Sequence, residues 1–186
     1  MSVSFPFLKR IVAALFAVCL FSFTAFAQTS ALDEMFERLK TADEGASGRI
    51  EREIWNEWSK SGSPAMDLLL QRGRDALAEG NIPEAIEHLT ALTDHAPDFA
   101  EGWNARATAY YQAGEFGPSV ADIARVLTLN PRHFGALSGL ASIHESLDNK
   151  PRALEIYRAA LAIHPNLAGV SSAIERLEKD TSGTEL

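Results

Sequence analysis

The chain has 186 residues, of which 46% are hydrophobic, and it carries 25 acidic and 17 basic side chains. This length suits one domain with a short appendage and is too small for two full enzyme domains. The formal net charge of −8 argues against a nucleic-acid partner, because binding to a phosphate backbone relies on many lysines and arginines. The single cysteine, Cys19, excludes an intramolecular disulfide and a cysteine-based zinc site.

The first 27 residues have the layout of a secretory signal peptide. Lys9 and Arg10 precede a nearly uninterrupted apolar run up to Phe21, and small residues stand at positions 25 and 27. We expect cleavage after Ala27, which would leave a cysteine-free, periplasmic protein. The alternative is a retained membrane anchor, because the apolar stretch has about the minimum length that spans a bilayer.

Three prolines, Pro97, Pro131 and Pro165, follow one another at intervals of 34 residues. In the windows that they define, apolar residues recur at three- and four-residue spacing in two blocks, with turn residues between the blocks. This pattern predicts one helical hairpin for each window. The eighth and twentieth positions hold small residues, which we expect where two helices approach closely: Gly73, Ala107, Ala141, Ala85, Ser119 and Ala153.

This pattern resembles the tetratricopeptide repeat, a 34-residue unit with characteristic tryptophan, glycine, tyrosine, alanine and proline positions. The first and third windows depart from it, since Ala76 and His144 replace the tyrosine. The resemblance implies an all-α fold, a right-handed α-solenoid of three helical hairpins. The middle window matches best, at Trp103, Ala107, Tyr110, Ser119, Ile123 and Pro131.

The N-terminal part of the mature chain has two further amphipathic stripes, which predict a helical hairpin. Its 34-residue span from residue 32 to 65 suits a degenerate fourth repeat, whereas Glu51 at the expected small position suits a capping hairpin. Both alternatives stay open. The predicted segments are 1–27 as signal peptide, 28–65 as N-terminal hairpin, 66–99, 100–133 and 134–167 as repeats, 168–180 as C-terminal capping helix, and 181–186 as disordered tail.

The sequence offers no convergent set of catalytic groups. The mature chain would lack a cysteine nucleophile, and the sequence has no GxSxG elbow, no glycine-rich phosphate loop and no HExxH pair. His88 and His95 lie seven residues apart, but two ligands are too few for a metal site. We therefore expect a protein that is not an enzyme and that has neither a cofactor nor a bound metal.

The resemblance implies that the first helices of the repeats line a concave surface that binds a protein or a peptide. Arginine, amide and aromatic side chains on this face suit peptide backbone or carboxylate groups, although they also suit a merely solvated surface. Some members of this family grip the C-terminal carboxylate of a partner with lysine, asparagine and arginine side chains. This sequence lacks such a clamp, because the corresponding positions hold Leu70, Ala105, Gly135 and Gly139. The candidate binding residues are Arg74, Glu101, Asn104, Thr108, Tyr111, Gln112, Ser138 and Ser142.

A second candidate surface is the stripe that carries Trp55 and Trp58, which either binds a partner or seals the repeats. The leading hypothesis is a non-catalytic periplasmic adaptor or assembly factor with a protein or peptide partner. One alternative is a membrane-anchored recruitment subunit that keeps its N-terminal helix. Others are a non-catalytic subunit of an envelope enzyme complex, and self-association through an unsealed end repeat.

Overall fold

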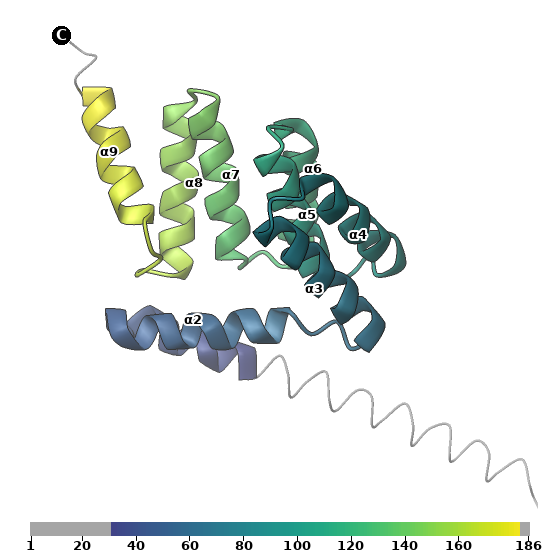
Figure 1. Cartoon of the computed structure of the whole chain (residues 1–186). Helices are drawn as coiled ribbons and strands as arrows, with labels where there is room; N and C mark the ends of the chain where they lie inside the picture. The colour runs from purple at the N-terminus through teal and green to yellow at the C-terminus, as the bar shows by residue number, and fades with distance from the viewer. Residues whose placement is uncertain (1–30, 183–186) are drawn as a thin grey trace, which may run out of the picture.

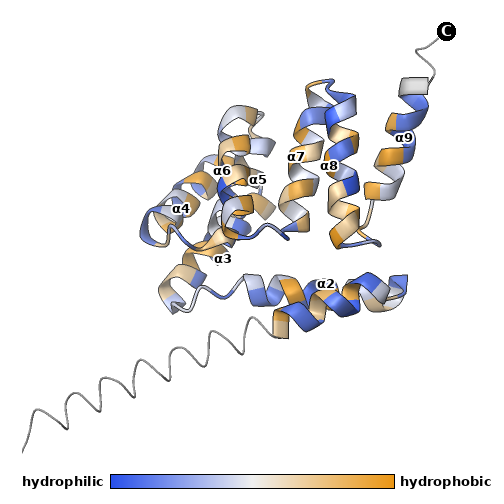
Figure 2. Ribbon diagram, turned by 180° about the vertical axis from the view of Figure 1, so that it is seen from behind, coloured by the Kyte–Doolittle hydropathy of each residue, from blue (hydrophilic) through white to orange (hydrophobic). Residues whose placement is uncertain are grey.

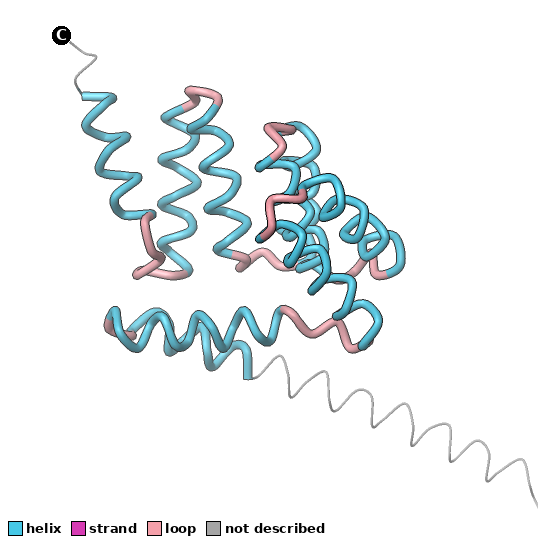
Figure 3. The backbone as a smooth tube through the Cα atoms, viewed as in Figure 1, coloured by secondary structure: helices cyan, strands magenta, loops and turns pink. Residues whose placement is uncertain are grey.

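The computed structural model describes residues 31–182, and Figure 1 shows how their helices are arranged. The segment predicted to be a signal peptide and residues 183–186 of the predicted tail lie outside the described residues. A first helix covers residues 31–41. The labelled helices that follow are α2 (Glu44–Trp58), α3 (Pro64–Ala78), α4 (Ile82–His95), α5 (Ala100–Gln112), α6 (Phe116–Leu129), α7 (Phe134–Ser146), α8 (Lys150–Ile163) and α9 (Val170–Ser182). Only helices and loops occur in this part of the chain (Figure 3).

The three expected hairpins are the pairs α3–α4, α5–α6 and α7–α8. Each pair is joined by a tight turn in which one residue has a positive φ, at Gly80 (77°), Gly114 (76°) and Asp148 (54°). These three residues are spaced by the 34-residue period, so the turn geometry repeats together with the sequence. Glycine tolerates this left-handed backbone without a steric penalty, and aspartate is among the few other residues that adopt it.

The small residues at the eighth and twentieth repeat positions allow the two helices of a hairpin to touch. A Cβ atom added at Gly73 would lie 2.5 Å from Leu89 Cγ, closer than real carbon atoms approach. In the second hairpin, the Ser119 hydroxyl donates a hydrogen bond of 2.7 Å to the main-chain oxygen of Ala107. Both Ser119 and Ala107 are buried, so this contact fixes the distance between α5 and α6.

Consecutive hairpins stack through a polar contact as well as an apolar one. The Arg106 guanidinium on α5 donates to both carboxylate oxygens of Asp122 on α6, at 2.7 and 2.9 Å. The same group donates to the hydroxyl of Thr93 on α4 at 2.8 Å. Arg106 therefore joins the first hairpin to the second. Hydrogen bonding to Asp122 raises the pKa of Arg106 above its ordinary value, so the guanidinium stays charged.

The C-terminal helix α9 covers the last hairpin. Val170, Ala173 and Leu177 are buried and share one apolar cluster with Ala153 and Tyr157 of α8. Amphipathic patterning is visible around the helices in Figure 2, where hydrophobic and hydrophilic residues alternate along each ribbon. None of the described helices is both long and apolar enough to cross a membrane.

The N-terminal helices do not form a fourth repeat. Helix α2 runs across the ends of α7, α8 and α9 instead of standing beside α3 (Figure 1). Its buried Ile54 belongs to one cluster with Phe36 of helix 31–41 and with Phe134 at the start of α7. The apolar stripes of this hairpin are therefore buried against the start of α7 and the end of α8, and the placement differs from that of a repeat stacked beside α3.

Candidate protein-binding groove

A pocket of about 160 Å³ opens between the second and third repeats, on the face formed by α5 and α7. Its floor is apolar and buried, because Ala107, Ile123, Ala136 and Ile143 are each exposed by 3% or less. Small-molecule sites usually enclose about 300–1,000 Å³, so this pocket suits one side chain better than a cofactor. Its lining residues are Asn104, Ala107, Thr108, Tyr111, Ser119, Ile123, Gly135, Ala136, Gly139, Ser142 and Ile143.

The pocket exists because α7 has a glycine, Gly139, on the side that faces α5 and α6. Gly135 and Gly139 stand where the second repeat has Glu101 and Ala105, one 34-residue period earlier. A Cβ atom at Gly139 would have Ile123 Cδ1, at 3.8 Å, as its nearest neighbour outside its own helix, which is an ordinary contact. The space beside Gly139 is thus unfilled by the protein.

Four of the predicted binding residues lie around this pocket: Asn104, Thr108, Tyr111 and Ser142. The Tyr111 side chain is partly exposed and its ring lies 5.7 Å from that of Phe116. Two others lie elsewhere, since Gln112 and Ser138 do not line the pocket. Ser138 is half-buried, and its main-chain oxygen accepts a hydrogen bond from Ser142. The structure therefore brings half of the predicted set together at one place.

The remaining two predicted residues, Arg74 and Glu101, bind each other. Arg74 donates to Glu101 Oε1 at 2.5 Å and to the Ser59 hydroxyl at 3.0 Å, beside the end of α2. Glu101 is only 2% exposed, so its carboxylate is not available to a partner. These residues hold the N-terminal hairpin against the repeats, which differs from the expected role in peptide binding.

His133 completes this network and was not singled out by the sequence. Its Nδ1 accepts a hydrogen bond from the main-chain N–H of Ala136 at 3.0 Å, so it caps the start of α7. The ring proton of a neutral imidazole then lies on Nε2, which faces Glu101 Oε2 at 3.1 Å. The carboxylate of Glu101 consequently has partners on α3 and on the loop before α7.

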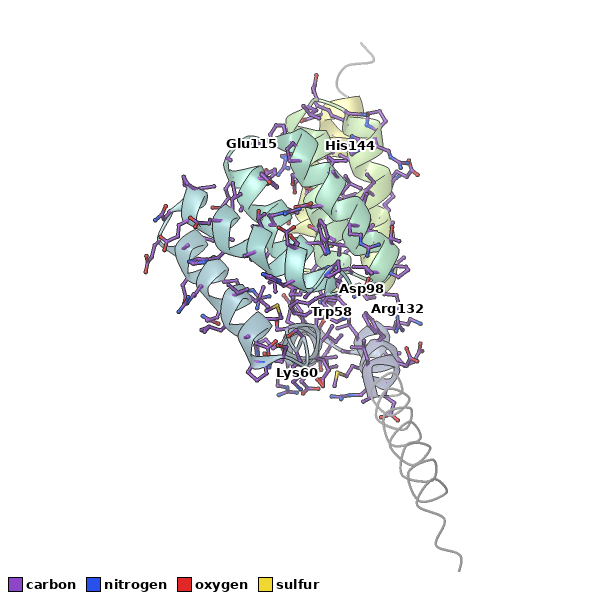
Figure 4. All side chains as sticks on the ribbon, turned by 90° about the vertical axis from the view of Figure 1, so that its right-hand side faces the viewer. Trp58, Lys60, Asp98, Glu115, Arg132 and His144 are labelled. Atoms are coloured by element: carbon purple, nitrogen blue, oxygen red, sulfur yellow. The ribbon has the colours of Figure 1, made fainter. Side chains whose placement is uncertain are left out.

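Tryptophan side chains of α2 pack on this loop. The Trp58 ring stacks on the His133 ring with 4.3 Å between centroids, and Trp55 meets Phe134 edge-on at 5.7 Å. Figure 4 shows Trp58 at the junction between α2 and the repeats. Trp55 also explains Gly135, since a Cβ atom there would lie 2.8 Å from the indole. The tryptophan stripe thus has the sealing role, although it seals inter-repeat loops and not the open end of the solenoid.

Two further polar contacts tie the N-terminal hairpin to the repeats. His164, which is fully buried in the loop between α8 and α9, lies with Nε2 3.3 Å from Glu51 Oε2. Arg132 pairs with Asp33 at 2.5 Å, and its guanidinium lies 4.2 Å above the Phe36 ring. His164 directly precedes Pro165 and His133 follows Pro131 by two residues, and this proximity to the repeat prolines is a sequence signal that could have drawn attention to them.

The titratable groups in the part of the chain that the structure describes do not form a metal centre. No three His, Cys, Asp or Glu side chains there are close enough to hold a metal ion. Near the pocket, the Tyr157 hydroxyl lies 3.0 Å from Ser142 Oγ and donates to Glu145 at 3.2 Å. Burial raises the pKa of Tyr157, so the phenol is neutral and acts as a structural hydrogen-bond donor.

Comparison with known proteins gives the same architecture. A tetratricopeptide repeat family model matches residues 70–118 and 105–168. A TPR repeat-containing protein of Rhizobium etli is 36% identical over 153 residues, which cover 82% of this chain and 75% of that protein.

Two solved structures have a fold similar to that of this chain. The first TPR domain of Spaghetti (RPAP3), bound to the HSP90 peptide SRMEEVD, is similar with a TM-score of 0.60 at 21% identity, covering 63% of this chain and 93% of that one. The crystal structure of MamA has a TM-score of 0.60 at 18% identity and covers 78% of this chain and 83% of that one. The chain belongs to the tetratricopeptide repeat family.

Proposed function

We propose that this protein is a non-catalytic adaptor or assembly factor of the bacterial cell envelope, which binds a segment of another protein on the concave face of its repeats. The observation that carries this proposal is the pocket between α5, α6 and α7, with its buried apolar floor and uncharged polar rim. An apolar recess surrounded by a few polar groups is the usual form of a binding site for a side chain.

Membership of the family supports the interaction role. The similar domain of Spaghetti is described as bound to a peptide from HSP90, and a TPR2B domain of yeast Sti1 is described in complex with an Hsp70 peptide. Those proteins share only about a fifth of their residues with this chain, at 21% identity in both cases. Their peptides therefore support a binding role without naming the partner.

Export is the second part of the proposal, and the N-terminal sequence supports it. Lys9, Arg10 and the apolar run that follows, together with the small residues before Gln28, favour cleavage after Ala27. Intact-mass spectrometry of the protein from a periplasmic extract tests this directly. A mass that begins at Gln28 supports the periplasmic adaptor, whereas the full-length mass in the membrane fraction would replace it with the membrane-anchored alternative.

The binding role is tested by affinity capture from envelope extract of the source organism. The wild-type protein is compared with an Asn104→Ala, Tyr111→Ala variant, which removes two rim groups of the pocket. A matched control, Glu87→Ala with Thr128→Ala, changes two exposed side chains of α4 and α6 that do not line the pocket. Circular dichroism and thermal unfolding confirm that the variants are folded.

We expect one or a few proteins to be held by the wild type and by the control but lost from the rim variant. Equal retention by all three proteins would place the interaction away from the pocket and would contradict the proposed site. Turnover of a substrate by the purified protein alone would contradict the non-catalytic part of the proposal.

A further inference from the structure

The rim of the pocket offers hydrogen-bond acceptors more than donors. The Asn104 amide nitrogen is 3.2 Å from Glu101 Oε1 and donates to it, which leaves the amide oxygen of Asn104 for a ligand. The Thr108 hydroxyl donates to the main-chain oxygen of Asn104 at 3.1 Å, and the Ser142 hydroxyl donates to that of Ser138 at 3.1 Å. The hydrogens of these two hydroxyls are thereby used within the protein, which leaves lone pairs on Thr108, whereas the Ser142 oxygen also lies 3.0 Å from the Tyr157 hydroxyl. The remaining donors of the rim are the second amide hydrogen of Asn104 and the Tyr111 hydroxyl, which is also an acceptor.

Acceptor groups match the N–H groups of a peptide backbone, whereas a carboxylate needs donors or cations. The described residues that line the pocket include no charged side chain. Arg74, which lies on the same face, is already paired with the buried carboxylate of Glu101. The chain as a whole carries a net charge of −8, which further disfavours an acidic ligand.

The floor determines which side chain the pocket accepts. Ala107, Ala136, Ile123 and Ile143 present only aliphatic atoms, and the volume of about 160 Å³ suits one branched side chain. Burial of such a side chain is favourable because it removes apolar surface from water. A charged side chain would be desolvated there without a partner, which carries a large free-energy penalty.

From these contacts we propose that the pocket takes one branched aliphatic side chain from an internal, uncharged segment of the partner, whose backbone N–H groups bind Asn104 and Thr108. No chain-terminal carboxylate takes part. This inference rests on the proposed function, because it specifies the ligand of the same concave face. It distinguishes this protein from the similar domain of Spaghetti, because the HSP90 peptide bound there, SRMEEVD, is rich in acidic residues.

The test uses 12-residue random peptides displayed on phage as N-terminal fusions to a coat protein, so that no peptide has a free carboxyl end. Peptides selected on the full mature protein are synthesised in two forms, as C-terminal amide and as free acid, and their dissociation constants are measured by fluorescence anisotropy. The blocking variant is Gly139→Leu, which fills the pocket from α7 without a Cβ clash. The matched control is Gly117→Leu on α6, where a Cβ meets no described atom within 4 Å.

We expect the selected peptides to share one leucine, isoleucine or valine position. Its replacement by alanine, or the Gly139→Leu substitution in the protein, should weaken binding at least about tenfold, since a buried branched side chain contributes roughly that much. Gly117→Leu should bind as the wild type does. The amide and the free acid should bind within about twofold of each other.

Several results would overturn the inference. Wild-type affinity of the folded Gly139→Leu protein, a marked preference for the free acid, selection of acidic peptides, or failure to select any peptide would each contradict it. The Asn104→Ala, Tyr111→Ala variant separates this from failure of the proposed function. If that variant loses the selected peptide while Gly139→Leu retains it, the concave face binds but the pocket does not. If both retain it, the proposed binding face is wrong as well.

Discussion

The indole of Trp58 lies flat on the imidazole of His133, with 4.3 Å between ring centroids and 18° between the ring planes. The two residues belong to the N-terminal hairpin and to the loop between the second and third repeats. His133 is fully buried by this contact and faces Glu101 on the other side. The N-terminal hairpin is therefore an integral part of the repeat domain and lies close to Gly135 and Ala136, which line the pocket.

Removal of the Trp58 ring should destabilise the whole domain. We expect Trp58→Ala to lower the free energy of unfolding by about 3 kcal/mol, because it opens a cavity over His133 and Phe134. Trp58→Phe, which keeps an aromatic ring, should lose clearly less. Urea denaturation monitored by circular dichroism measures both. An unchanged midpoint for Trp58→Ala would show that the hairpin does not stabilise the repeats.

Two glycines on α7 should respond in opposite directions to the same substitution. Gly135→Ala places a Cβ 2.8 Å from the Trp55 indole and should destabilise by about 1–3 kcal/mol through overpacking. Gly139→Ala meets its nearest atom at 3.8 Å and should be neutral or stabilising by up to about 1 kcal/mol, since alanine favours a helix over glycine. Thermal unfolding of the pair checks this. Equal changes in the melting temperature of the two variants would contradict the packing of Trp55 on α7.

Replacing one member of the Arg106–Asp122 ion pair should destabilise the protein, whereas replacing both members by apolar residues should not. The pair is largely buried, so Asp122→Ile alone should destabilise by about 3 kcal/mol, because it leaves the guanidinium without its carboxylate. One period later, the third repeat has Leu140 and Ile156 at the same two positions. The Arg106→Leu, Asp122→Ile protein should therefore recover most of the lost stability. A double variant as unstable as the sum of the singles would contradict this equivalence of the repeats.

Tyr157 should make stability depend on alkaline pH. Burial raises its pKa above the ordinary value of 10.0, so the folded protein holds the phenolic proton more tightly than the unfolded chain does. The resulting stabilisation is fully present below pH 10 and is lost as the pH rises through the folded-state pKa. Urea denaturation between pH 8 and 11 should show a smaller decline for Tyr157→Phe than for the wild type. Identical declines would contradict the described environment of this phenol.

The repeats were predictable from the sequence because their contacts are local and periodic. The turn residues Gly80, Gly114 and Asp148 and the small helix-contact positions recur every 34 residues, so one register explains all three hairpins. The placement of the N-terminal hairpin was not predictable in this way. It depends on contacts such as that of Glu51 with His164, which are 113 residues apart and follow no period.

The site was predictable in part for a related reason. The helical periodicity of the repeats places Asn104, Thr108, Tyr111 and Ser142 on the concave face, and these four residues line the pocket. The same reasoning placed Glu101 on an open surface, but the loop that carries His133 covers it. The two glycines of α7 were noticed as missing clamp residues. That Gly139 leaves a pocket, whereas Gly135 makes room for the Trp55 indole, follows only from the distances in the structure.

Binding of a partner protein at the pocket is tested most directly by site-specific photo-crosslinking in intact cells. A benzophenone amino acid is placed at Tyr111, at the mouth of the pocket, and in a control protein at Leu147, which is more exposed but does not line the pocket. We expect a discrete crosslinked protein from position 111 that disappears when Gly139→Leu fills the pocket, and no such adduct from position 147. The same adducts from both positions, or an adduct at 111 that Gly139→Leu leaves unchanged, would contradict it.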